Sequence, residues 1–387
     1  MFTKKILAIT SIRSDYDLMT QLYQLLNKDI DIELKLLVSG AHMSPSFGKS
    51  VDLIHKDGFD ILVKLETLID SDTNVSRLKT ASLLLQNSID IIEAYRPDLI
   101  IYCGDREDVI IGGLIGGYLE IPTLHFYGGD HVKDGHFDNP IRHATSKLSC
   151  VHMVSLYQHK NRLIKMGENP DRIFSIGSIA LDKFCKHKPC SKNEIKSFFN
   201  IKRGFHTFVL IIFHPVLEEK ESAGLYFENI LKTLKNKNIH AIVSAPNTDP
   251  GNRKIFKMIE KYKSDENFVF YKNLDREMFL SVYKHSSFII GNSSSGIIEA
   301  ASIPIPAVNV GLRQVGRYSG ENVVFCNTDM LSIGKAIEKV MNKDFLNSPS
   351  EFKNPYGDGN SSIKAYEIIK KTDFRKFLLK KEDPLEP

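Results

Sequence analysis

Short apolar runs in this chain end in polar loops whose side chains can bind phosphate or transfer protons. Arg13 and Asp15 follow the run ILAIT, and an arginine beside a helix N-terminus suits a phosphate or a nucleotide. An N-cap aspartate with a solvent-facing arginine explains the same residues. Asp105 and Arg106 follow DLIIYCG, where a carboxylate acts as a general acid or base or simply caps a helix. His42, in the glycine turn SGAHM, is a further candidate, although a lone histidine there is more often structural.

The segment from His125 to His143 is the most polar loop of the chain. It holds four histidines, three aspartates, a lysine and an arginine around glycine turns. His and Asp are metal ligands, but their spacing here matches no zinc signature. The composition therefore favours a polar sugar or phosphate site, and no metal is predicted.

The second half repeats the arrangement. His214 follows FVLIIF and Asn247 follows HAIVSAP, although a satisfied cap explains each equally well. The strongest local signal is GNSSSGIIEA, whose strand, small-residue turn and helix suit a diphosphate, with a glutamate in reach of ribose hydroxyls. The candidate residues around it are Ser293, Ser294, Glu299 and Arg313. The sequence has no Walker A lysine and no GxGxxG loop, which argues against a P-loop ATPase and a dinucleotide oxidoreductase.

The elements that must position these residues are parallel strands joined by helices. ILAIT, IELKLLV and DLIIYCG alternate with amphipathic helical segments, and HAIVSAPN, FVFYKN and SSFIIGNSSSG repeat the pattern. The rhythm breaks at the basic stretch CKHKPCSKNE. We therefore predict an α/β protein of two Rossmann-like domains, residues 1–185 and 186–387, with a ligand cleft between them. A terminal basic helix is expected in the second domain.

Composition excludes several other classes of protein. The 387 residues suffice for about two domains, and 42% hydrophobic with 25% charged residues is the ordinary globular mix. The net charge of +4 is small and dispersed, so no nucleic-acid partner is predicted. Five scattered cysteines fit reduced thiols, and no apolar run reaches the ~20 residues of a membrane span. We predict a cytoplasmic protein without a membrane anchor.

Taken in order, these loops resemble the hydrolysing UDP-N-acetylglucosamine 2-epimerase family over nearly the whole chain. The matching pieces are SIRSDYD, SGAHM, GDRED, IRHATSKLS, FHPV, PNTD, GNSSSGIIEA, GLRQVGR and YGDGN. Each is weak alone, but their order and spacing are specific to the family. The resemblance implies two glycosyltransferase-B-type domains, a UDP-sugar substrate, a homodimer and no cofactor. It implies a free sugar such as N-acetylmannosamine, or a diacetamido analogue, for sialic or legionaminic acid synthesis.

The family reaction implies roles for these residues. UDP is eliminated across C1 and C2 to give a 2-acetamidoglycal, after which water adds at C1 and a proton at C2. By residue matching, Asp105 and Asp138 take catalytic carboxylate positions, and His214 faces the diphosphate and sugar. The residues expected to contact the nucleotide or sugar are Arg13, Asp15, His42, Arg106, Arg142, His143, Asn247, Ser293, Ser294, Glu299 and Arg313.

One motif departs from the family pattern. Where the family reads HxEGGE this chain reads HFYGGD, so Tyr127 stands at the position of a catalytic glutamate. The stretch between Gly129 and Arg142 is also two residues longer, and LE replaces TT after FHPV. A phenol is a poor base at neutral pH but can donate a proton or hold water. Either Asp130 replaces the carboxylate, or epimerisation is lost or changed, which leaves a sugar-nucleotide hydrolase, a glycosyltransferase or a non-catalytic binding protein as alternatives.

Overall fold

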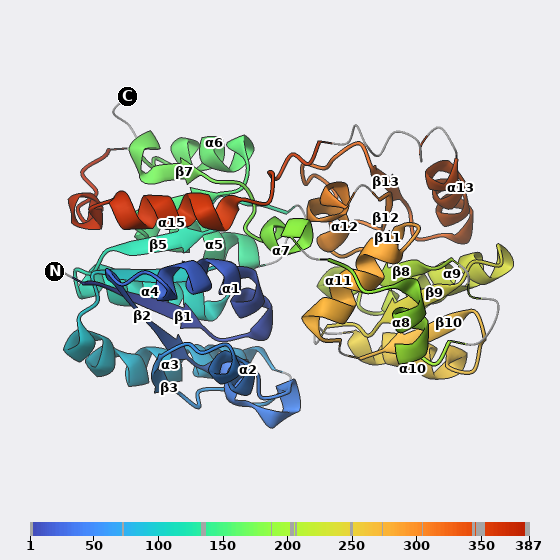
Figure 1. Ribbon diagram of the computed structural model, residues 1–387, viewed down its shortest axis with the longest axis horizontal. Helices are drawn as coiled ribbons and strands as arrows, with labels where there is room; N and C mark the ends of the chain where they lie inside the picture. The colour runs from blue at the N-terminus through green and yellow to red at the C-terminus, as the bar shows by residue number, and fades with distance from the viewer. Residues whose placement is uncertain are drawn as a thin grey trace. The chain divides into compact units, whose positions relative to one another are not determined.

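The computed structural model describes residues 3–71, 73–132, 137–186, 188–201, 205, 207–247, 251–272, 274–303, 305–342, 345 and 353–383. The chain divides into two compact units. The first comprises residues 1–131, 137–182 and 359–387, and the second comprises residues 132–136 and 183–358. Each unit is built on one parallel sheet with helices packed against it (Figure 1). The predicted α/β class with two Rossmann-like domains is confirmed, and the ligand cleft stays a prediction.

The first unit has seven parallel strands in the order β3-β2-β1-β4-β5-β6-β7. The strands are β1 (Lys4–Thr10), β2 (Ile32–Val38), β3 (Ile61–Lys64), β4 (Leu99–Cys103), β5 (Thr123–Phe126), β6 (Val151–Val154) and β7 (Ile173–Ser175). The helices are α1 (Arg13–Asn27), α2 (Val51–Lys56), α3 (Asn74–Tyr95), α4 (Glu107–Tyr118), α5 (Asp138–Leu148), α6 (Tyr157–Lys165), α7 (Leu181–Lys186), which contains the division between the units, and α15 (Ser361–Lys371). The strand order switches between β1 and β4, and ligands of such sheets bind outside the carboxyl ends of the strands at this point.

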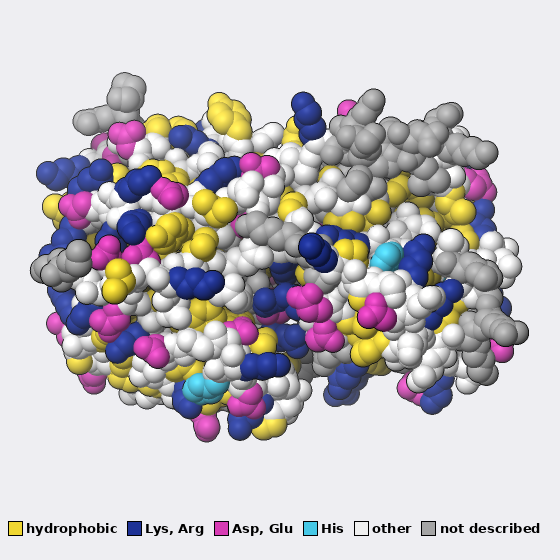
Figure 2. All heavy atoms as spheres, viewed as in Figure 1, with side chains coloured by type: hydrophobic (Ala, Val, Ile, Leu, Met, Phe, Trp, Pro, Cys, Tyr) yellow, Lys and Arg dark blue, Asp and Glu magenta, His cyan; other side chains and the backbone are white. Residues whose placement is uncertain are grey.

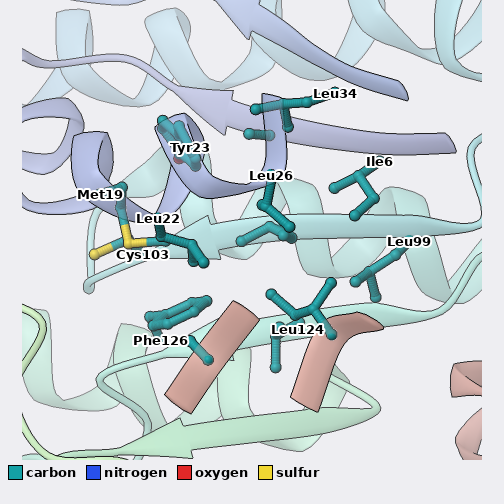
Figure 3. Packing of buried hydrophobic residues seen from close by; sticks show 14 of the residues in the cluster. Ile6, Met19, Leu22, Tyr23, Leu26, Leu34, Leu99, Cys103, Leu124 and Phe126 are labelled. Carbon is teal, nitrogen blue, oxygen red and sulfur yellow. The ribbon is translucent and has the colours of Figure 1, made fainter. Parts of the chain in front are cut away.

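Helices cover both faces of this sheet because successive strand residues point to opposite sides. Ile6 belongs to the core formed with α1 and α15, whereas its neighbour Leu7 belongs to the core formed with α3 and α4. Met19, Leu22 and Leu26 recur at helical spacing on α1 and point towards the strands in Figure 3. This packing fixes the start of α1, and with it the polar loop that follows β1.

The second unit has six parallel strands in the order β10-β9-β8-β11-β12-β13, which switches between β8 and β11. The strands are β8 (Val209–Ile212), β9 (Ala241–Ser244), β10 (Phe268–Tyr271), β11 (Ile289–Gly291), β12 (Ala307–Val310) and β13 (Val323–Cys326). The helices are α8 (Lys192–Phe198), α9 (Ala223–Asn236), α10 (Asn252–Tyr262), α11 (Arg276–His285), α12 (Ser295–Ile298) and α13 (Met330–Met341). The loops after β8 and β11 carry the predicted His214 and the serine turn.

The helix expected after GNSSSG is shorter than the sequence suggested. α12 is a single turn of four residues, and a 3-10 turn over Ala300–Ser302 follows it. The chain must reach β12 at Ala307, and Pro306 directly before that strand disfavours helical conformation in the preceding residue. So short a helix sums few peptide dipoles. The predicted anion binding at Ser293 and Ser294 would therefore depend on hydroxyls and loop N–H groups rather than on a helix end.

The terminal helix α15 packs in the first unit, which differs from the predicted second domain of residues 186–387. Ala365 and Ile369 belong to the same core as α1, and the Tyr366 hydroxyl donates to Asp29 at 2.6 Å. Figure 1 shows the red helix beside α1. The helix lies here because α1 covers its apolar stripe, and a periodic pattern in the sequence does not say which sheet a helix covers.

Asp182 anchors this returning helix, and its removal is expected to destabilise the first unit. The fully buried carboxylate accepts the backbone N–H groups of Ser361 at 3.0 Å and Ser362 at 2.5 Å. Asp182→Ala leaves two buried donors unpaired, so we expect urea unfolding to show a loss of about 2 kcal/mol. The control is Asp329→Ala, which removes an exposed N-cap that accepts from Ser332 at 2.9 Å and should cost about 1 kcal/mol or less. Equal losses in both variants would contradict a special role for burial at Asp182.

Charged side chains of both signs lie on the surface, and the helices can be compared with the length of a membrane span. Figure 2 shows Lys and Arg side chains interspersed with Asp and Glu over the visible face where side chains are described. Within the described ranges, no helix combines the length and the apolar character needed to cross a bilayer.

Candidate active site

Two carboxyl groups and an arginine lie where β1 and β4 end. Asp15 is in the first turn of α1, and a Cβ placed on Gly104, directly after β4, would lie 3.9 Å from its Oδ2. This oxygen is buried and has no hydrogen-bond partner among the described residues, while Ser14 donates to Oδ1 at 3.1 Å. Burial raises the pKa of Asp15 to about 7, against the opposing effect of Arg106. Burial also raises the pKa of Asp108 to about 6, helped by the neighbouring glutamate. Both carboxyls can therefore exchange protons near neutral pH.

The raised pKa of Asp15 predicts that stability falls with rising pH. The folded protein keeps this proton up to about pH 7, whereas the unfolded chain releases it near pH 4. Between these values the native state binds more protons than the unfolded state, so this carboxyl destabilises the fold as pH rises. Relative to wild type, Asp15→Asn should gain on the order of 4 kcal/mol between pH 4 and pH 8, because the pKa shift is about three units and each unit corresponds to about 1.4 kcal/mol. Urea unfolding at both pH values measures the gain. Asp52→Asn, on the exposed side of α2, should show none, and equal behaviour of the two variants would refute the prediction.

A buried arginine holds Asp105. The guanidinium of Arg142, which is 4% exposed, donates to the Asp105 carboxylate, and its Nη1 lies 3.9 Å from Asp130 Oδ2. Asp130 is 7% exposed; its Oδ1 accepts the backbone N–H of His131 at 2.8 Å and lies 3.3 Å from His159 Nε2. Asp105 is the more accessible carboxylate, with 24% of its side chain exposed. The predicted Arg142 therefore contacts two carboxylates of its own unit, and Asp105 is the one that faces outward.

Tyr127 and Asp138 both belong to the polar segment that runs from His125 to His143. The Tyr127 hydroxyl is 3.3 Å from Ser178 Oγ, and its backbone φ is +65°, which is uncommon for an aromatic residue and indicates a constrained loop. Asp138 is the first residue of α5 and is about one-third exposed, with Arg77 Nη2 3.7 Å from its Oδ1.

His42 lies inside the first unit rather than at a loop surface. It is fully buried, with Thr10 Oγ1 2.9 Å from Nε2 and Ser50 Oγ 2.7 Å from Nδ1. Burial lowers the pKa of His42 to about 4, so the ring is neutral at pH 7. The ring is thus held between two hydroxyl side chains, and its contact with substrate stays a prediction.

His143 and Arg13 differ in how much of each side chain is engaged by neighbouring residues. The His143 ring stacks on His131, with centroids 5.4 Å apart and planes at 7°, and burial lowers its pKa to about 4. Arg13 begins α1 and pairs with Asp17 one turn later at 3.5 Å, yet 42% of its side chain stays exposed. Arg13 is therefore the better placed of the two to meet an anionic ligand.

In the second unit, Asn292 joins the loops that follow β8 and β11. Its Oδ1 accepts the His214 backbone N–H and its Nδ2 donates to the His214 carbonyl, both at 2.7 Å. Arg313 and Gln314 each donate to the Asn292 carbonyl at 3.1 Å. The Asn247 backbone N–H donates to His214 Nδ1 at 3.1 Å. The structure thus brings the predicted His214, Asn247 and Arg313 together around a residue that the sequence analysis had not selected.

His214 is a neutral hydrogen-bond donor in this arrangement. Burial, with Arg313 nearby, lowers its pKa to about 3. Because Nδ1 accepts a backbone N–H, the ring hydrogen of the neutral imidazole lies on Nε2. His214 can therefore donate to a phosphate or sugar oxygen at neutral pH without carrying charge.

The serine turn after β11 is followed by the buried carboxyl group of Glu299. Gly291 has φ of +143°, and a Cβ there would lie 2.0 Å from the Ile212 carbonyl oxygen, so only glycine fits. Ser293 Oγ accepts the Ser295 N–H at 3.3 Å. Glu299 is buried, which raises its pKa, and its Oε2 has no hydrogen-bond partner in the described part of the chain. A hydroxyl donor from a ligand would satisfy this oxygen.

Some predicted features lie outside the described residues. These are residues 133–136, within the lengthened polar segment, and residues 248 and 249 of the PNTD motif. Among the residues that are described, no group of three or more His, Cys, Asp or Glu side chains is arranged to hold a metal ion.

Comparison of sequences gives matches along most of the chain. A protein family model described as UDP-N-acetylglucosamine 2-epimerase matches residues 24–370. The hydrolysing UDP-N,N'-diacetylbacillosamine 2-epimerase of Legionella pneumophila is 32% identical over 381 residues, which cover 98% of each chain. The polysialic acid biosynthesis protein P7 of Escherichia coli is 28% identical and covers 95% of this chain and 94% of its own.

Solved structures share the fold. The UDP-N-acetylglucosamine 2-epimerase of Neisseria meningitidis, bound to UDP-N-acetylglucosamine, matches with a TM-score of 0.81 at 18% identity, over 95% of this chain and 100% of that one. The enzyme of Methanocaldococcus jannaschii, in complex with UDP-N-acetylglucosamine and UDP, matches with a TM-score of 0.77 at 18% identity and the same coverage.

Proposed function

The chain belongs to the UDP-N-acetylglucosamine 2-epimerase family, and we propose that it is a hydrolysing enzyme that converts a UDP-activated 2-acetamido sugar into UDP and the free C2-epimeric sugar. The observation that carries the proposal is Asp105, an accessible carboxylate at the strand switch point of the first unit, held by the buried Arg142. The relatives named as hydrolysing 2-epimerases support water as the second reactant.

The proposed reaction has two steps. A carboxylate removes the C2 proton while the C1–O bond breaks, its electron pair leaves on the β-phosphate of UDP, and a C1–C2 double bond forms. Water then adds its oxygen to C1, and C2 accepts a proton on the face opposite to the one deprotonated. The sum is UDP-sugar and water giving UDP and the epimeric free sugar, without a hydride carrier.

We assign the groups of the first unit to proton transfer. Asp105 and Asp138 act as the catalytic carboxylates, because both are partly exposed and each lies beside an arginine. Asp15, with its pKa raised to about 7, supplies a further proton-exchanging group near Arg106. Tyr127 can donate a proton or hold water. Asp130 lies near Arg142 and His159 and helps to position the groups of the site.

We assign the groups of the second unit to the nucleotide. His214 donates through Nε2 to the diphosphate or sugar, while Arg313 and the serine turn contribute positive charge and hydroxyl donors. Glu299, with its unpartnered oxygen, accepts from a ribose hydroxyl. Such groups stabilise the charge that develops on the leaving UDP.

We propose that the substrate is one of two UDP-activated 2-acetamido sugars, with either one or two acetamido groups. The 32% identical relative is named for UDP-N,N'-diacetylbacillosamine, and the Neisseria meningitidis relative, 29% identical, is named for UDP-N-acetylglucosamine. Tyr127 at the expected glutamate position favours one alternative, hydrolysis with retained configuration at C2.

Proton NMR in deuterated water tests the proposed function. The purified protein is given UDP-N-acetylglucosamine or the UDP-diacetamido sugar, and UDP release, C2 configuration and C2 deuterium are followed. An inverted, deuterated C2 in the free sugar supports elimination and epimerisation. A retained, undeuterated C2 shows simple hydrolysis, and unchanged substrate in both reactions refutes the proposal. Full activity after exhaustive chelation is expected, and sedimentation tests the predicted homodimer.

A further inference from the structure

Helix α6 packs directly on the loop that carries the polar segment. Gly129 has φ of +74°, and a Cβ there would lie 2.4 Å from the His159 carbonyl oxygen and 3.0 Å from Leu163 Cγ. The α6 backbone can approach so closely only because residue 129 lacks a side chain. The Arg162 guanidinium, from the next turn of α6, donates to the Gly129 carbonyl. The loop at residues 127–131 is therefore held by α6 through both packing and a hydrogen bond.

Among the described residues, one polar side-chain contact is seen for His159 of this helix. Its Nε2 lies 3.3 Å from Asp130 Oδ1, and within the described part of the chain its Nδ1 has no hydrogen-bond partner. His159 is 5% exposed, and the Asp130 carboxylate lies within hydrogen-bond distance of its Nε2. Buried polar side chains usually have their polar atoms paired, so a buried histidine whose polar neighbour is one carboxylate calls for an explanation.

Asp130 in turn competes with Asp105 for the same arginine. Arg142 donates to Asp105, while its Nη1 stays 3.9 Å from Asp130 Oδ2, a distance too long for a hydrogen bond. The donors on the other oxygen of Asp130, His159 and the His131 N–H, reduce the pull of this carboxylate on the guanidinium. Without the His159 donor, the more strongly negative Asp130 would attract Arg142 away from Asp105.

We propose that His159 is a positioning residue for the epimerase reaction: by satisfying Asp130, it leaves Arg142 bonded to Asp105. The inference rests on the proposed function only in taking Asp105 as the catalytic carboxylate. The chain of contacts runs from α6 through the loop after β5 to α5 and the loop after β4, all within the first unit.

His159→Leu tests the role by kinetics. The substitution keeps an apolar side chain of similar size and removes the donor, so we expect kcat to fall about 10- to 100-fold, as small misplacements of catalytic groups do. KM for the UDP-sugar should stay within about threefold, because the nucleotide contacts assigned above lie in the second unit. His159→Gln, whose amide N–H can reach Asp130, should restore kcat to within about threefold of wild type. Tyr157→Ala, on the exposed side of the same helix, is the control and should match wild type.

A crystal structure of His159→Leu gives a readout that does not depend on turnover. We expect Arg142 Nη1 to move from 3.9 Å to hydrogen-bond distance of Asp130, and its bond to Asp105 to lengthen. Arg142 in its wild-type position, or a kcat loss that His159→Gln does not restore, would overturn the proposal in favour of a packing role. If the wild-type protein turns over neither UDP-sugar while Arg142 moves in the variant, the proposed function fails, and what stands is that His159 keeps Arg142 bonded to Asp105.

Discussion

Asp105→Asn is expected to lower kcat about 1000-fold or more while UDP binds with unchanged affinity. The amide keeps the shape of the side chain but cannot take the C2 proton, and loss of a positioned general base costs 10²- to 10⁴-fold in rate. UDP affinity should be preserved because the groups assigned to the nucleotide, His214 and Arg313 among them, lie in the second unit. UDP release measured in a coupled assay gives the rate, and isothermal titration calorimetry gives the affinity.

The matched control for this substitution is Asp90→Asn. Asp90 is exposed on α3, and the change should leave both rate and affinity as in wild type. A rate within about threefold of wild type for Asp105→Asn would show that the assignment of this carboxylate is wrong. Loss of UDP binding together with activity would instead show that the side chain supports the nucleotide site.

Arg142→Met is expected to lower the free energy of unfolding by about 3–5 kcal/mol. Arg142 is 4% exposed and faces the carboxylates of Asp105 and Asp130, so its removal leaves two negative charges close together without their shared cation. Urea unfolding followed by circular dichroism measures the loss. Adding Asp130→Asn to Arg142→Met should recover part of it, because one of the unpaired charges is then neutral.

An exposed ion pair supplies the comparison for this loss. Arg96 pairs with Glu93 at 2.6 Å, and both side chains are half exposed, so Arg96→Met should cost less than about 1 kcal/mol. If Arg142→Met costs no more than Arg96→Met, the buried pair would contribute no more than a surface one.

The sheets could be predicted from the sequence because each strand is a local apolar run. ILAIT and DLIIYCG became β1 and β4, and the polar residues after them lie at the strand switch point as expected. The return of α15 to the first unit could not be predicted, since its apolar stripe fits either sheet equally well. The length of α12 depended on Pro306 and the nearby start of β12, which the helical pattern of IIEAAS did not reveal.

The sequence indicated where single candidate residues lie relative to the strands, but it did not indicate which of them contact one another. Asp105 was selected because it directly follows a buried strand, but its bond to Arg142 joins residues 37 positions apart and leaves no local pattern. His42 was taken as a ligand contact because its loop follows β2, whereas the loop folds as a 3-10 turn that buries the ring. Asp108 was not selected, although a carboxylate at the start of the apolar helix VIIGGLIGGYL is itself a recognisable signal. Asn292 was not selected, because the interpretation of GNSSSG rested on the serines that follow it.

The return of α15 also sets an order of events during protein synthesis. The first unit needs residues 359–383 for its core and for the carboxylate of Asp182, yet the ribosome makes the whole of the second unit before them. Until then, the apolar face of α1 that α15 covers is open to solvent. The second unit, by contrast, is continuous from residue 183 to residue 358 apart from the segment 132–136, so it can complete its sheet while still attached to the ribosome. The unit that is begun first is therefore finished last, and a nascent chain paused near residue 358 exposes an incomplete core to chaperones and proteases.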